Sequence, residues 1–252
     1  MTAGVSCHRD GGVLRVGLDK PEKLNAVNTP MLVALRDTIS AAANDDSVRV
    51  MALTGAGRAF CSGGDLSGED TKGAAAAAAE VIAAITESPK PFVAGVRGAA
   101  VGVGCSIALA CDLAVVAQSA FFQLAFTKVG LMTDGGASAL IPAAIGRARA
   151  VRMAFLAEKI TAATAFEWGM ISHVVADDNY EREFDDVVET LATGPTLSYG
   201  WIKRAMSAST LAELAAVQEI ETRGQEILNR TEDFRAGVRS FRAQTPPDFR
   251  GR

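Results

Sequence analysis

The chain has 252 residues, of which 49% are hydrophobic and 21% are charged, and its formal net charge at pH 7 is −4. This composition fits one large domain, or one domain with an appendage, and the acidic balance argues against bulk nucleic-acid binding. Apolar runs are too short to span a bilayer, and the N-terminus has no basic segment before an apolar one, so we expect a cytoplasmic protein. The four cysteines form no Cys-x-x-Cys pair, so we expect reduced thiols and no metal site.

Strands and helices are predicted to alternate in the first half of the chain, which is typical of an α/β core. Alternating apolar residues predict a strand over 13–18. Asn28 or Thr29 can cap a helix that has Pro30 at its first position and runs to about residue 43. The other elements expected here are a strand over 48–53, a helix over 74–85, a strand over 91–96, a helix over 104–110 and a strand over 113–116.

The second half of the chain, beyond Ser138, is predicted to be almost entirely helical. Gly194 and Pro195 interrupt two of these helices, so we expect an α/β core over 1–194 and a helical region over 195–252. Within that region the segment 210–213 matches a capping box, which predicts that a helix opens there.

Two glycine-rich segments, 55–66 and 98–106, lie about one helix apart in the sequence. Glycine lets the backbone approach a ligand closely and adopt positive φ. Each segment can therefore aim a backbone N–H into one cavity, and two convergent N–H donors are what a developing oxyanion needs. The alternative is that both segments are tight turns and nothing more.

The whole pattern resembles the enoyl-CoA hydratase/isomerase, or crotonase, superfamily. The resemblance is carried by the segments 18–28, 59–66, 108–113, 146–150 and 232–237, together with Phe241 and Phe249. It implies an α/β fold built as a spiral of ββα units, followed by a C-terminal α-helical trimerisation region that also covers coenzyme A. It also implies a homotrimer or a dimer of trimers, with no membrane and no nucleic-acid partner.

The resemblance further implies an acyl-CoA thioester as substrate and no permanently bound cofactor. The oxyanion hole would be formed by the backbone N–H groups of Gly64 and Val103. Residues implied to bind the substrate are Lys23, Ala26, Gly63, Asp65, Leu66, Ser106, Phe126 and Phe241. Lys20, Lys23 and C-terminal residues of a neighbouring subunit would meet the phosphates, with Arg242 replacing a lysine that relatives often carry where Gln244 stands; both lysines could equally be merely solvated.

Acid and base groups distinguish the activities within this superfamily. Its hydratases use two glutamates to activate water, and the matching positions here hold Ser106 and Phe126. Asp134 stands where dienoyl-CoA isomerases and the isomerase of phenylacetate breakdown carry an aspartate. One carboxylate is enough for a 1,3-proton shift. The alternative role for Asp134 is to cap a helix that starts near Ala137.

We therefore expect an enoyl-CoA isomerase in which Asp134 moves the proton while Gly64 and Val103 hold a dienolate oxygen. Two alternatives remain open: an acyl-CoA-binding protein with little or no catalysis, and a weak hydratase. A serine hydrolase built on Ser106 would need a base, and the sequence places neither His8 nor His173 for that role.

Overall fold

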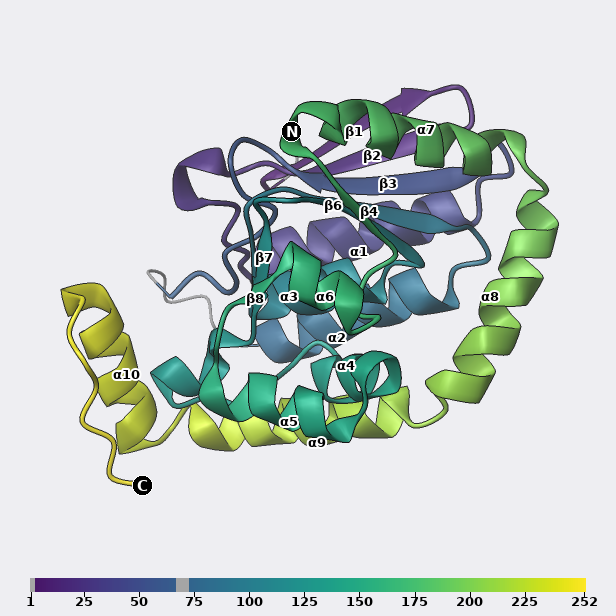
Figure 1. Ribbon diagram of the computed structural model, residues 1–252. Helices are drawn as coiled ribbons and strands as arrows, with labels where there is room; N and C mark the ends of the chain where they lie inside the picture. The colour runs from purple at the N-terminus through teal and green to yellow at the C-terminus, as the bar shows by residue number, and fades with distance from the viewer. Residues whose placement is uncertain (1–2, 67–72) are drawn as a thin grey trace.

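The computed structural model describes residues 3–66 and 73–252. A six-stranded sheet lies at the centre of the molecule (Figure 1), in the order β1-β2-β3-β4-β6-β9. Its first two strands pair antiparallel and the others parallel. The strands are β1 (Val5–Asp10), β2 (Val13–Leu18), β3 (Val50–Gly55), β4 (Phe92–Val96), β6 (Leu113–Ala117) and β9 (His173–Val175).

A second, three-stranded sheet has the order β5-β7-β8. Its strands are β5 (Ala99–Val101), β7 (Phe121–Gln123) and β8 (Ile160–Thr161). Along the chain, β4 and β6 belong to the first sheet while β5 and β7 belong to the second, so consecutive strands alternate between the two sheets. This alternation, with helices between the turns, is the expected spiral.

Helices cover both faces of the large sheet. On one face, Phe184 and Val188 of α7 (Tyr180–Thr193) pack on Val50 and Val93. The opposite face meets α1 (Thr29–Ala43), α2 (Ala74–Glu87) and α3 (Val103–Ala110) in the main core. The remaining helices of this part are α4 (Ala137–Ile145), α5 (Arg147–Leu156), α6 (Ala162–Glu167) and the 3-10 turns η1 (Pro21–Lys23), η2 (Ala125–Val129) and η3 (Asp177–Asn179).

The C-terminal region consists of α8 (Thr196–Thr210), α9 (Leu214–Leu228) and α10 (Glu232–Ala243). In Figure 1, α8 runs down one side of the molecule, α9 passes beneath the core against α2 and α4, and α10 packs on η2. The buried Lys203 ties α8 to the core, because its Nζ lies 2.8 Å from Asp112 Oδ2 and 2.7 Å from the carbonyl of Ile85. No helix in the described ranges is long and apolar enough to cross a membrane.

The structure confirms several expected elements and shifts others. Strand 13–18 is β2, and Asn28 caps α1 by accepting a hydrogen bond from the Met31 N–H at 3.2 Å. The helix break at 194–195 separates α7 from α8. The strand expected over 48–53 lies two residues later, as β3, because Val48 still belongs to the turn after α1.

One expectation about the second half was wrong, and another holds with small exceptions. The capping box at 210–213 does not open a helix: Thr210 is the last residue of α8, its Oγ1 donates to the carbonyl of Met206 at 2.8 Å, and α9 begins at Leu214. The region beyond Ser138 is mostly helical, as expected, and the exceptions among its regular elements are the short strands β8 and β9, which extend the two sheets. Strands of two and three residues give too little pattern to be recognised in the sequence.

Candidate active site

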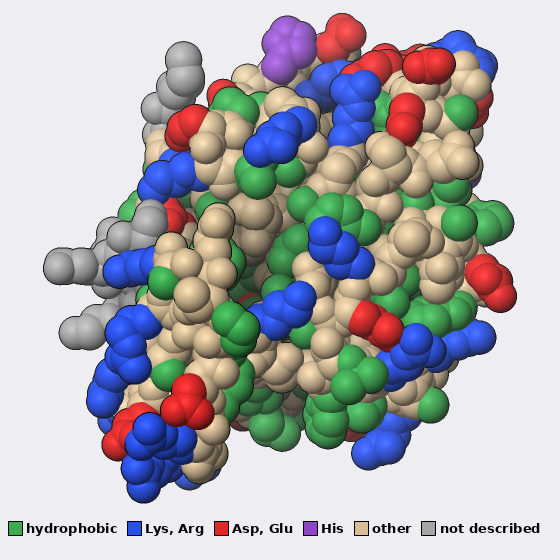
Figure 2. Space-filling model, turned by 60° about the vertical axis from the view of Figure 1, so that its left-hand side comes forward, with side chains coloured by type: hydrophobic (Ala, Val, Ile, Leu, Met, Phe, Trp, Pro, Cys, Tyr) green, Lys and Arg blue, Asp and Glu red, His purple; other side chains and the backbone are tan. Residues whose placement is uncertain are grey.

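A cavity of about 340 Å³ lies between the large sheet's helices and the C-terminal region. It is mostly apolar and is lined by residues of α1, α2, α3, η2, α9 and α10 and by the segment 62–66. Figure 2 shows the face that carries α10, where the surface is hollowed and lysine and arginine side chains lie around the hollow. A concave apolar pocket with a few polar groups is the usual form of a small-molecule site.

The two glycine-rich segments meet at this cavity, as expected. Val27 pairs with the first segment by donating its N–H to Gly63 and accepting from the N–H of Asp65, at 2.9 and 2.8 Å. Gly64 lies between these two bonded residues, and its own N–H donates no hydrogen bond within the described part of the chain. One unused donor of the first segment therefore lies in the cavity wall.

The second segment supplies another unused donor. Gly102 follows β5 and is the N-cap residue of α3; it has φ +55° and ψ −128°, a conformation that L-residues rarely adopt. Val103 is the first residue of α3, and an N–H in the first turn of a helix has no partner within that helix. No other described residue accepts it, so the N–H of Val103, like that of Gly64, is available to a ligand.

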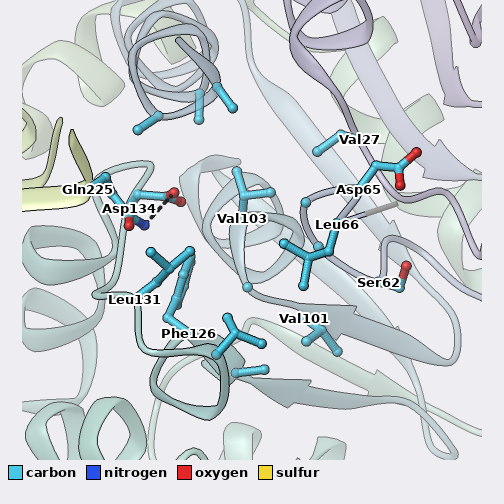
Figure 3. Close-up of a pocket in the computed structure, with 18 of the residues that line it drawn as sticks. Val27, Ser62, Asp65, Leu66, Val101, Val103, Phe126, Leu131, Asp134 and Gln225 are labelled. Carbon is cyan, nitrogen blue, oxygen red and sulfur yellow. Dashed lines mark hydrogen bonds between the residues drawn. The ribbon is translucent and has the colours of Figure 1, made fainter. Parts of the chain in front are cut away.

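Asp134 points its carboxyl group into the cavity toward Val103 (Figure 3). Its Oδ2 accepts a hydrogen bond from Gln225 Nε2 at 3.0 Å, whereas its Oδ1 is buried and has no partner among the described residues. Burial of the carboxyl group, followed by the nearby charge of Glu221, raises the pKa of Asp134 to about 7, and the Gln225 bond opposes this rise. A carboxyl group that titrates near neutral pH suits proton transfer.

The loop that carries Asp134 is held from two sides. Ser106 Oγ donates to the Asp134 carbonyl at 2.8 Å. Gly135 and Gly136 follow with φ +61° and +74°, and they turn the chain into α4. The capping alternative for Asp134 is wrong, because the N-terminus of α4 is satisfied by Glu221, which accepts from the N–H groups of Gly136 and Ser138 at 2.7 and 2.9 Å.

The two positions that hold glutamates in hydratases carry no acid here, as the sequence indicated. Phe126 is 8% exposed and places its ring in the cavity wall. Ser106 is fully buried and is not among the residues that line the cavity, so the expectation that it binds substrate is not supported by the lining. Of the two positions, only Phe126 therefore faces the cavity, and it presents an apolar ring.

Only some of the other expected substrate-binding residues line the cavity. Gly63, Asp65 and Leu66 line it, and so does Phe241 of α10, which is 63% exposed. Lys20, Lys23, Ala26 and Arg242 are not among the lining residues. Two of these contact the lining: Lys23 Nζ is 2.8 Å from Asp65 Oδ2, and Arg242 Nη2 donates to the Leu66 carbonyl at 2.6 Å.

Sequence reasoning missed Gln225 and Glu221, although α9 carried a signal. The buried positions of this helix are Leu214, Gln218, Glu221 and Gln225. Their spacing of three or four residues is that of one helix face. Polar residues at positions where a packed helix normally presents apolar ones indicate buried hydrogen bonds, and here they reach the Asp134 loop.

The serine-hydrolase alternative lacks its base. The Ser106 hydroxyl donates a hydrogen bond to the Asp134 carbonyl. His173, on β9, has its Nδ1 2.9 Å from Ser172 Oγ, and His8 is exposed on β1. Among residues 3–66 and 73–252, no group of three or more His, Cys, Asp or Glu side chains is arranged to hold a metal ion.

The two-sheet spiral, the helical C-terminal region and the paired glycine-rich segments define a protein of the crotonase fold. A solved enoyl-CoA hydratase from Mycobacterium avium subsp. paratuberculosis superposes with a TM-score of 0.96 at 40% identity, covering 99% of this chain and 100% of that one. The family model described as enoyl-CoA hydratase/isomerase matches residues 8–252. The chain therefore belongs to the enoyl-CoA hydratase/isomerase family.

Two curated relatives differ in their named activities. The 1,2-epoxyphenylacetyl-CoA isomerase of Escherichia coli is 36% identical over an alignment of 255 positions, gaps included, that covers 97% of each chain. A probable enoyl-CoA hydratase of Rhodobacter capsulatus is 38% identical over 247 residues, covering 96% of this chain and 95% of that one. Family membership thus leaves the reaction to be argued from the residues in the cavity.

Proposed function

We propose that this protein isomerises the carbon–carbon double bond of an enoyl-CoA thioester. The observation that carries the proposal is the carboxyl group of Asp134, which faces a cavity with two unused N–H donors and no acid at the hydratase positions. The other acid lining the cavity in the described ranges, Asp65, is paired with Lys23 at its mouth. A relative from Streptococcus mutans, 31% identical to this chain, is named trans-2-decenoyl-[acyl-carrier-protein] isomerase, and its name supports isomerisation of an enoyl thioester.

In the proposed reaction the thioester oxygen accepts hydrogen bonds from the N–H groups of Gly64 and Val103. The Asp134 carboxylate removes a proton from C2 of a 3-enoyl thioester, and the electron pair moves onto the thioester oxygen as a dienolate. The protonated Asp134 then delivers that proton to C4, and the double bond comes to lie between C2 and C3. The apolar wall around Phe126 keeps water from competing for the intermediate.

Coenzyme A is proposed to enter along the mouth formed by Lys23, Leu66 and Phe241. The basic side chains around the hollow in Figure 2 support binding of its phosphates. A homo-oligomer is proposed as well, because the large apolar side chains of Leu197 and Trp201 on α8 are 84% and 68% exposed.

The products of an enoyl-CoA panel test the proposal. With 2-enoyl-CoA and 3-enoyl-CoA substrates of several chain lengths, we expect products of unchanged mass and altered chromatographic position. We expect negligible hydration of crotonyl-CoA, because Ser106 and Phe126 supply no acid. Addition of one water at a turnover number in the usual enzyme range of about 1–1000 per second would assign hydratase activity instead. No reaction with any substrate, together with tight acyl-CoA binding, would favour the binding protein.

The pH dependence of isomerisation should follow the ionisation of Asp134. Its pKa is raised to about 7 in the free protein, and the reaction starts from the carboxylate. The value of kcat/KM should therefore rise with pH and level off above about pH 7, and at pH 5 it should be about 100-fold below the plateau. Initial rates in overlapping buffers measure this profile. A rate that is flat from pH 5 to 8 would show that Asp134 is not the base.

A further inference from the structure

Asp134 lies near two side chains of α9, Glu221 and Gln225, that take no direct part in the proposed reaction. Glu221 and Gln225 lie one helical turn apart on the same helix face. Both are buried, with exposures of 1% and 2%. A buried charge and a buried amide are costly unless they are paired, so each needs a structural or functional reason.

Glu221 makes a two-fold contact with the start of α4. Its Oε2 accepts from the N–H of Gly136 and its Oε1 from the N–H of Ser138. Two backbone donors and the positive end of the helix dipole favour the ionised form of this carboxyl group. Burial raises the pKa of Glu221 above its ordinary value, and the hydrogen bonds from Ser138 and Gly136 oppose this rise.

Asp134 is stabilised less well as an anion. It accepts a single hydrogen bond, from Gln225 Nε2, and its second carboxyl oxygen is buried without a partner in the described part of the chain. Gln225 is oriented by the Met132 carbonyl, to which the same Nε2 donates at 2.8 Å. When two carboxyl groups lie near each other, the one that accepts fewer hydrogen bonds is the less stable as an anion. That group therefore takes up the proton first.

We propose that Glu221 and Gln225 are positioning residues for Asp134: Glu221 remains ionised on the N-terminus of α4 and favours a proton on Asp134, while Gln225 favours its carboxylate and fixes its orientation. This inference rests on the proposed function. Glu221 is the charged side chain that shifts the pKa of Asp134 within the described residues. The α3 partner of the loop, Ser106, is uncharged and bonds only the backbone carbonyl of Asp134.

Opposite shifts in the pH profile test the proposal. Glu221→Gln keeps an acceptor for α4 and removes the charge, so the midpoint of the kcat/KM profile should fall by about one pH unit. Relative to its own plateau, the rate at pH 5.5 should then rise about eightfold. Gln225→Met removes the hydrogen bond to the Asp134 carboxylate, so its midpoint should rise. Glu219→Gln, an exposed change on α9, should leave the profile unchanged.

A thermodynamic readout separates this inference from the proposed activity. Because the folded-state pKa of Asp134 is raised, the folded protein holds a proton that the unfolded chain releases, and this contribution to stability is lost between about pH 4 and 7. Asp134→Asn has no titrating group at this position, so its stability lacks this pH-dependent loss. The melting temperature of Asp134→Asn minus that of wild type should therefore increase as pH rises from about 4 to 7. In the Glu221→Gln background this increase should occur at lower pH.

The outcomes distinguish the two claims. The stability difference caused by Asp134→Asn could develop at lower pH in the Glu221→Gln background while no isomerisation is seen at any pH. That result would reject the proposed function and keep the positioning role. Isomerisation with the same midpoint in wild type and a folded Glu221→Gln would overturn the positioning role and leave Glu221 as a helix cap. If Glu221→Gln does not fold, Gln225→Met decides, because an unchanged or lowered midpoint in that variant contradicts the proposal.

Discussion

Replacement of Asp134 by asparagine is expected to lower the isomerisation rate at least about 100-fold, because general acid–base catalysis contributes about 10²–10⁴-fold. Asparagine keeps the shape of the side chain and can still accept the hydrogen bond that Gln225 donates at 3.0 Å. It cannot take up and return a proton. The rates of wild type and Asp134→Asn with the same 3-enoyl-CoA measure the effect.

Two controls give this comparison its meaning. The variant should bind a saturated acyl-CoA as tightly as wild type, because the mouth around Lys23 and Leu66 is untouched. Its melting temperature at pH 8 should be no lower than that of wild type, because burying an ionised Asp134 is unfavourable. Full activity of a folded Asp134→Asn would mean that another group moves the proton.

Removal of the Val103 N–H is expected to have an effect of similar size. Val103 is the first residue of α3, a position where proline is tolerated because its fixed φ suits the helix and no intrahelical bond is lost. Val103→Pro therefore deletes one donor to the thioester oxygen with little damage to the helix. Loss of one such donor typically costs about 3–4 kcal/mol in the transition state, or about 10²–10³-fold in kcat.

Val103→Ala is the matched control. It trims the same buried side chain and keeps the backbone N–H, so kcat should stay within about tenfold of wild type, the range that 1.4 kcal/mol of lost positioning would explain. If Val103→Pro folds with the melting temperature of Val103→Ala and turns over at the same rate, the N–H of Val103 does not contact the reacting thioester.

The alternating core was predictable because its signals are local. β2 has apolar residues at every second position, 14, 16 and 18, and the last two are buried. Asn28 and Pro30 mark the start of α1. β1 was missed because only Val5 of its six residues is buried, so it carries no alternation. The start of α9 was misplaced because the residues 210–213 fit a local capping pattern, while packing of Leu214 on the core decides where the helix begins.

The candidate site was predictable where backbone geometry carries it. Glycines beside Gly64 and Val103 indicate N–H groups that approach a ligand, and the sequence placed both segments in one cavity. Asp134 was found through resemblance alone, since one aspartate before two glycines also fits a helix cap. Glu221 and Gln225 lie more than 80 residues from the atoms they bond, and contacts at that separation leave no local pattern.

A crystal structure with a bound, unreactive saturated acyl-CoA would test the central claim most directly. We expect the thioester oxygen to lie within about 3.5 Å of the backbone nitrogens of both Gly64 and Val103. We also expect a carboxyl oxygen of Asp134 within about 3–3.5 Å of C2 or C4 of the acyl chain, as proton transfer requires. A thioester oxygen beyond reach of both nitrogens, or an acyl chain that leaves Asp134 facing only protein, would contradict it.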